Sequence, residues 1–98
     1  MNPNKADTYI PALAKTALDM PPLWGRLTSL SPTEAEFLSH FELPAGRVLA
    51  LSFELGRVSL EDVRARIAAA LRDGDGYYNY RLVFLDPAQS ALIKAALA

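Results

Sequence analysis

The side chains best suited to binding chemistry lie close together near residue 80. Tyr77, Asn79 and Arg81 occupy every second position, so in an extended segment they share one face. Tyrosine and arginine are enriched at protein interfaces, whereas a face that meets only solvent carries more lysine and glutamate. Trp24, the single tryptophan, stands in a proline-flanked stretch and could be an anchor for a partner or a plug in the core. These four residues are the predicted partner-binding residues.

The same tyrosine-rich segment could instead bind nucleic acid, because aromatic rings stack on nucleobases. The glycine–aromatic–small–aromatic order of an RNA-recognition motif is not met, since Tyr78 and Asn79 replace the small and the second aromatic residue. Ten basic and eleven acidic side chains give a net charge of −1, which does not attract a phosphate backbone. Nucleic-acid binding is therefore the second hypothesis.

The sequence offers little catalytic or metal-binding chemistry. It has no cysteine, which excludes disulfides and thiolate sites, and its one histidine is His40. Ser39 precedes it directly, and adjacent residues on a helix do not face one another. No GxSxG, P-loop, GxGxxG or HExxH motif is present. We predict no catalytic site, cofactor or metal; a small subunit contributing to an enzyme complex remains a further alternative.

The segment from Asp73 to Gly76 begins with the Asp-x-Asp spacing of a calcium loop. Such a loop then requires Asp or Asn followed by glycine, where this sequence has Tyr77 and Tyr78. The segment is therefore predicted to be a turn that ends a helix and leads into a strand.

Hydrophobic spacing predicts two helices in the N-terminal half. Over residues 8–19, apolar residues recur at the three- to four-residue period of a helix face. They are Ile10, Leu13, Ala14, Ala17 and Leu18. A second helix is predicted over residues 32–41, because Ser31 and Glu34 have the types and spacing of a capping box.

The C-terminal half predicts strands and helices in alternation. Residues 47–55 and 77–85 alternate between apolar and polar side chains, which is the two-residue period of a strand. A helix is predicted between them, over residues 59–73. A terminal helix is predicted from Asp86, which is followed by proline at the first helical position.

Together these elements predict one small domain over residues 1–98, with an α+β or small α/β fold. Its core would be a βαβ unit with parallel strands at 47–55 and 77–85, and three to four helices would pack on it. Two strands leave open sheet edges, which favours a homodimer or a subunit of a heteromeric assembly.

The favoured function is that of a small accessory or regulatory protein that binds another protein or itself. The N-terminus has no apolar signal region, and apolar runs such as residues 48–51 are far shorter than a membrane span. We therefore predict a soluble cytoplasmic protein without a membrane partner.

Overall fold

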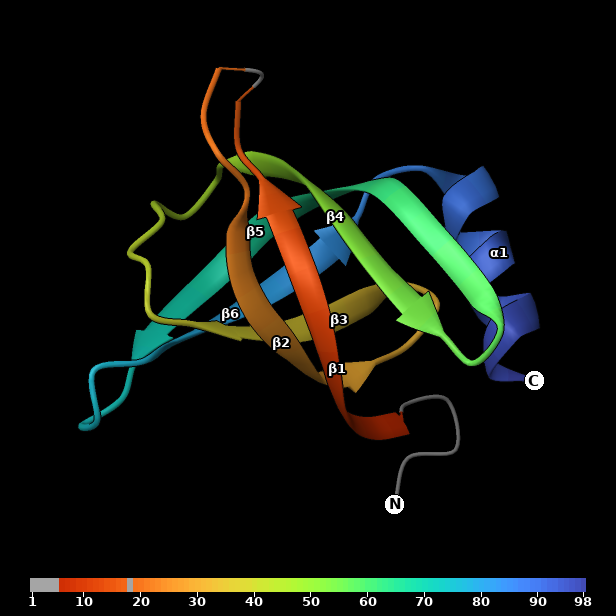
Figure 1. Cartoon of the computed structure of the whole chain (residues 1–98), viewed down its shortest axis with the longest axis horizontal. Coiled ribbons are helices and arrows are strands. Elements are labelled where there is room, and N and C mark those ends of the chain that lie inside the picture. Colours follow the sequence, from red (N-terminus) through yellow and green to blue (C-terminus); the bar gives the residue numbers. More distant parts are fainter. Residues whose placement is uncertain (1–5, 18) are drawn as a thin grey trace.

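Residues 6–17 and 19–98, which the computed structural model describes, form six strands and one helix (Figure 1). The elements are β1 (Ala6–Lys15), β2 (Leu23–Leu30), β3 (Glu34–Ser39), β4 (Val48–Leu55), β5 (Val58–Arg72), β6 (Tyr78–Phe84) and α1 (Pro87–Leu97). The strands close into a barrel in the order β1-β2-β3-β6-β5-β4. Every neighbouring pair is antiparallel.

The predicted α+β or α/β fold is wrong. The strands at 47–55 and 77–85 are confirmed as β4 and β6, and the terminal helix is confirmed as α1. The three helices predicted over 8–19, 32–41 and 59–73 are instead the strands β1, β3 and β5. Because β5 lies between β4 and β6 and is antiparallel to both, there is no parallel βαβ unit.

Irregular pairing explains why β5 resembles a helix in sequence. Val63 pairs with Leu51 and Leu60 with Phe53, so three steps along β5 match two steps along β4. The extra residue makes a bulge, where Asp62 adopts a left-handed φ of 53°. Leu60 and Val63 thus both point inward although they are three residues apart. A second register shift follows in the pairing with β6. The two shifts imitate the spacing of a helix face.

The segments β1 and β3 are strands although their sequences resemble helices, because their buried residues alternate and are mostly small. Ala12 and Ala14 are buried on β1, and Ala35, Phe37 and Ser39 are buried on β3. These positions follow the two-residue period of a strand. The interior of a narrow barrel accepts alanine beside large rings, so an alanine-rich segment need not be helical. Leu18, the last residue of the predicted helix face, lies outside the described residues.

A buried tyrosine ties the loop between β3 and β4 to the barrel. Tyr80 on β6 is fully buried and stacks with Phe37 at a centroid distance of 6.5 Å. Its hydroxyl accepts a hydrogen bond from the Leu43 backbone N–H at 2.7 Å and donates one to the Phe41 carbonyl. The ring fills the core, and its polar end satisfies the backbone of the loop.

The predicted capping box forms a hairpin turn instead of a helix start. The Glu34 backbone N–H donates to the Ser31 Oγ at 3.1 Å, as it would in a capped helix. However, the Ser31 N–H also donates to the Glu34 carbonyl at 2.8 Å, which closes the turn between β2 and β3. The side-chain contact was predicted correctly, but it belongs to a different element.

The helix α1 packs on β5 and β6 and is bound to β5 by one side chain. The Gln89 Nε2 donates to the Asp62 carbonyl at 3.1 Å, and the Arg64 N–H donates to the Gln89 Oε1 at 2.9 Å. Asp86 caps the helix by accepting from the Ala88 N–H at 2.9 Å. With 11 residues, α1 is too short to span a membrane, and it is the only helix among the described residues.

Candidate functional site

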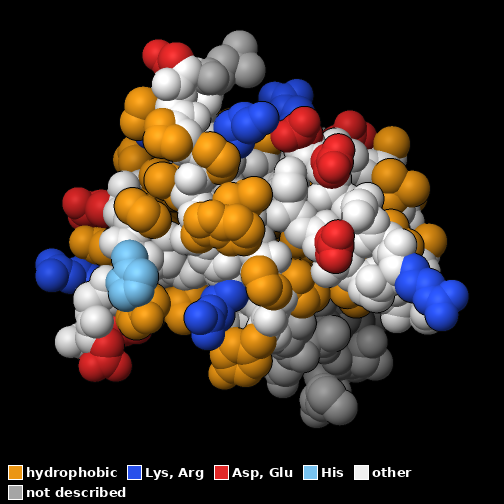
Figure 2. All heavy atoms as spheres, viewed as in Figure 1, with side chains coloured by type: hydrophobic (Ala, Val, Ile, Leu, Met, Phe, Trp, Pro, Cys, Tyr) orange, Lys and Arg blue, Asp and Glu red, His pale blue; other side chains and the backbone are white. Residues whose placement is uncertain are grey.

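Exposed aromatic side chains mark one face of the barrel. Trp24 lies near the start of β2 and is 63 % exposed, and Tyr9 on β1 is 78 % exposed. On this strand Trp24 and Arg26 point outward, because Leu23 and Gly25 take the alternate positions. Figure 2 shows hydrophobic side chains gathered over β1 and β2 on this face. The Trp24 side chain is therefore on the surface and is not part of the core.

Trp24 borders a hollow of about 500 Å³, which we call the basic hollow. It is lined by Tyr9, Pro11, Trp24, Gly25, Arg26, Leu38, Ser39, His40 and Tyr77. The His40 and Tyr77 rings lie in contact, with centroids 3.9 Å apart and planes tilted by 34°. Among these described residues Arg26 carries a positive charge, and none is a carboxylate. The basic hollow can thus offer aromatic surface and positive charge together.

Glycine shapes the floor of the basic hollow. A Cβ atom on Gly25 would lie 2.5 Å from the Phe37 Cζ and 2.6 Å from the Leu38 carbonyl oxygen, so no larger residue fits without displacing β3. Next to it, the Ser39 Oγ donates to the Trp24 carbonyl at 3.3 Å. The backbone that presents Trp24 is therefore held closely against β3.

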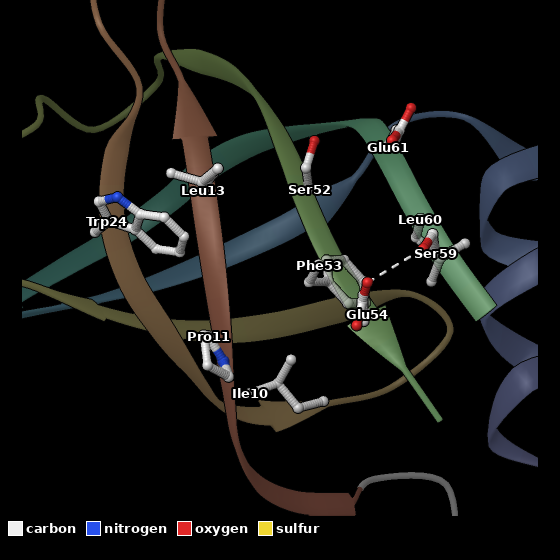
Figure 3. Close-up of a pocket in the computed structure, with 10 residues that line it drawn as sticks. All are labelled: Ile10, Pro11, Leu13, Trp24, Ser52, Phe53, Glu54, Ser59, Leu60 and Glu61. Carbon is white, nitrogen blue, oxygen red and sulfur yellow. Dashed lines mark hydrogen bonds between the residues drawn. The ribbon is translucent and has the colours of Figure 1, made fainter. Parts of the chain in front are cut away.

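A second hollow, of about 340 Å³, lies on the other side of Trp24 and is shown in Figure 3. Its charged lining residues within the described chain are Glu54 and Glu61, so we call it the acidic hollow. Its floor is apolar, with nearly buried Phe53 and Leu60. Trp24 thus separates two hollows of opposite charge.

The structure divides the four predicted binding residues into two groups. Trp24 and Tyr77 meet at the basic hollow, whereas Asn79 and Arg81 line a separate hollow with Glu36. The Arg81 Nη1 lies 3.9 Å from a carboxylate oxygen of Glu34. The alternation predicted for the strand at 77–85 is found in its second half, with Tyr80, Leu82 and Phe84 buried and Arg81 exposed. Tyr77, Tyr78 and Asn79 are all half-buried, so the predicted contrast between the two faces is absent there. Whether any of the four contacts a partner stays a prediction.

Sequence reasoning missed His40, Tyr9 and the acidic hollow. His40 was assigned to the end of a helix, where it could not have met Tyr77. Only the register of β3 with β6, in which Ser39 pairs with Tyr78, brings the two rings together. Glu54 and Ile10 had no recognisable signal, because their position depends on how the barrel closes.

Two further observations concern metal ligands and shifted pKa values among the described residues. Within residues 6–17 and 19–98, no three His, Cys, Asp or Glu side chains are grouped so that they could hold a metal ion. Among the described residues, Tyr80 has a pKa that clearly departs from its ordinary value, because burial raises the pKa of its hydroxyl. Tyr80 lies in the core and lines neither hollow.

The sequence matches no model of a known protein family, and no curated protein matches it. Solved structures are nevertheless similar in fold. The Bacillus subtilis inhibitor of motility MotI/DgrA aligns over 95 % of this chain with a TM-score of 0.73 and 12 % identity. YcgR from Escherichia coli in complex with c-di-GMP aligns over 93 % with a TM-score of 0.73 and 16 % identity. The PilZ domain of YcgR with c-di-GMP aligns over 90 % with a TM-score of 0.67 and 17 % identity.

These similarities establish a PilZ-like barrel. The chain spans 47 % of MotI/DgrA and 41 % of YcgR, but 79 % of the isolated PilZ domain. It therefore spans less than half the length of the two longer proteins.

Proposed function

We propose that this chain is a non-catalytic regulatory module that binds another protein through the Trp24 surface, defined as Tyr9, Trp24, Arg26, His40 and Tyr77. The observation that carries the proposal is the exposure of Trp24, 63 % on a strand of a closed barrel. A large apolar ring on a rigid strand gains free energy when a partner removes it from water. A regulatory role is supported by the similar fold of an inhibitor of motility.

The charges beside Trp24 favour a specific partner over unspecific hydrophobic contact. Arg26 and His40 lie on one side of the ring, and Glu54 and Glu61 lie on the other. A partner with a carboxylate facing Arg26 and cations facing Glu54 and Glu61 would bind in one orientation, because the reverse orientation places like charges together. Interfaces of this kind have an apolar centre and a polar rim.

Co-purification with a matched control tests this proposal. We expect Trp24→Ala to remove the protein that co-purifies with the native chain, because truncation of a central interface tryptophan costs about 2 kcal/mol or more. Leu92→Ala is the control, since Leu92 on α1 is 57 % exposed and lies outside the Trp24 surface. Quantitative mass spectrometry measures the partner. Equal loss with both variants, or no loss with Trp24→Ala, contradicts the proposal.

Binding of a cyclic dinucleotide is a second candidate function. Two of the similar structures contain c-di-GMP. In this chain the basic hollow combines Arg26 with aromatic rings, and these groups bind phosphates and purine bases. Calorimetry with c-di-GMP tests it, with Arg26→Ala as the variant and Arg57→Ala, in the turn after β4, as the control. Binding that is weakened about tenfold or more by Arg26→Ala alone supports this candidate. Absence of heat at low salt rejects it.

A further inference from the structure

The barrel is split where β1 and β4 part. Their antiparallel pairing runs from Lys15 with Ala50 to Ala12 with Phe53, and it ends there. β4 continues to Leu55 and stays paired with β5. Figure 3 shows the two strands diverging below this point, with side chains of both directed into the space between them. The acidic hollow occupies this split.

Both sides of the split are strand edges. Within the described residues, Ile10 and Pro11 of β1 are paired with β2 and not with β4, and Glu54 of β4 is paired with Ser59 of β5. Successive residues of an antiparallel strand direct their backbone groups to opposite sides. Since Leu55 and Val58 close the tight turn to β5, the backbone N–H and C=O of Glu54 are directed toward the split. Pro11, at the point where pairing stops, has no N–H to donate.

The side chains of the split define what could occupy it. The floor is formed by Phe53 and Leu60, which are 5 % and 4 % exposed, and Ile10 borders it as a half-buried residue. The rim carries the exposed carboxylates of Glu54 and Glu61. An occupant must therefore combine apolar side chains on one side with cations, and it must be extended to pair with Glu54.

We propose that the split binds an extended segment of the partner protein, rich in lysine or arginine and in aliphatic residues, which adds a strand to the open edge of β4. The inference rests on the proposed function, because it takes protein binding as given and names the segment that binds. Strand addition supplies backbone hydrogen bonds, and alternate side chains supply specificity. Here one set of side chains contacts Phe53 and Leu60, and cations meet Glu54 and Glu61.

A second copy of this chain fits the split poorly. If two β4 edges paired, the Glu54 carboxylates of both copies would approach one another across the new ladder. Like charges on neighbouring strands are destabilising. The homodimer was predicted from a two-stranded sheet, and the six strands form a barrel instead. The charge of the split thus favours a basic segment of a different protein.

Designed peptides test the inference directly. The probes are three blocked hexapeptides: alternating Lys–Val, alternating Glu–Val, and Lys–Val with N-methyl groups on the valines, which remove their N–H donors. Binding to the ¹⁵N-labelled full chain is measured by NMR. We expect the Lys–Val peptide to shift the amide signals of Ile10, Glu54 and Leu55, and to bind about tenfold or more tightly than the other two.

Charge reversal in the protein supplies the matched variant. The double variant Glu54→Lys with Glu61→Lys should prefer the Glu–Val peptide, whereas Glu42→Lys with Asp75→Lys adds the same charge outside the hollow and should keep the native preference. At about 0.15 M salt, distant charges are screened, so the two variants are separable. Equal binding of all three peptides, or shifts confined to other strands, overturns the inference.

The co-purification experiment separates failure of this inference from failure of the proposed function. If Trp24→Ala removes the native partner but the charge-reversed variant retains it, the proposed function stands and the split is not its docking site. If the charge-reversed variant loses the native partner while Trp24→Ala retains it, the proposed Trp24 surface is wrong and the strand-addition site stands.

Discussion

At the scale of single residues, Tyr80 connects the core to the loop that follows β3. Its hydroxyl is the described hydrogen-bond partner of the Leu43 N–H, and Leu43 is itself buried. Tyr80→Phe keeps the ring but leaves this N–H without its acceptor. We expect a loss of about 1–3 kcal/mol in the free energy of unfolding, measured by urea denaturation. Tyr9→Phe, at an exposed ring, is the control and should change stability by less than about 0.5 kcal/mol.

The same hydroxyl predicts how stability depends on alkaline pH. Burial raises the pKa of Tyr80 above its ordinary value of 10.0, the hydrogen bond from Leu43 lowers it by a smaller amount, and the nearby Tyr78 and Glu42 raise it. The folded state therefore holds this proton more tightly than the unfolded state. Its contribution is complete below pH 10 and is lost as the pH rises toward the folded-state pKa. In Tyr80→Phe, the decline of stability above pH 10 should be shallower than in the native chain; an equally steep decline would contradict this assignment.

At the scale of elements, Gln89 fastens α1 to the β5 bulge through both ends of its amide. Gln89→Ala removes two hydrogen bonds and leaves Ile93 as the buried anchor of the helix. We expect faster amide hydrogen exchange throughout α1, with β3 and β6 unchanged, because local opening costs less free energy. Lys94→Ala, at an exposed position of the same helix, is the control and should leave exchange near the native rate. Unchanged protection of α1 in Gln89→Ala would show that packing alone holds the helix.

Elements also show what could be predicted from the sequence. β4, β6 and α1 were found because their pairing or capping is regular, so local pattern and structure agree. The sequence of β5 was misassigned to a helix because a bulge at Asp62 shifts the inward positions by one residue. The spacing of apolar residues in one sequence cannot distinguish a bulged strand from a helix. Trp24 was recognised as a candidate anchor by residue type. Its neighbours His40 and Tyr9 were not, because both stand in or beside segments predicted as helices, whereas they reach Trp24 through the pairing of β1 and β3 with β2.

At the scale of the whole molecule, barrel closure assembles the candidate surfaces. The basic hollow takes residues from β1, β2, the end of β3 and the segments that follow β3 and precede β6. The acidic hollow takes residues from β1, β2, β4 and β5. Each hollow therefore needs more than two elements to form it. A variant that weakens closure would therefore disturb both surfaces together, which is why each test above includes a control at an exposed position.

The strand order also determines how the chain must fold. The hairpins β1–β2, β2–β3, β4–β5 and β5–β6 join strands that follow one another in the sequence, so each can form locally. The pairings of β3 with β6 and of β1 with β4 bring together segments that are distant along the chain. The loss of chain entropy in such contacts slows folding relative to helical proteins of equal size. Of these two distant pairings, β1 with β4 has four residue pairs and β3 with β6 has six, so the β1–β4 seam gains less from closing and is the last step of assembly that the topology favours.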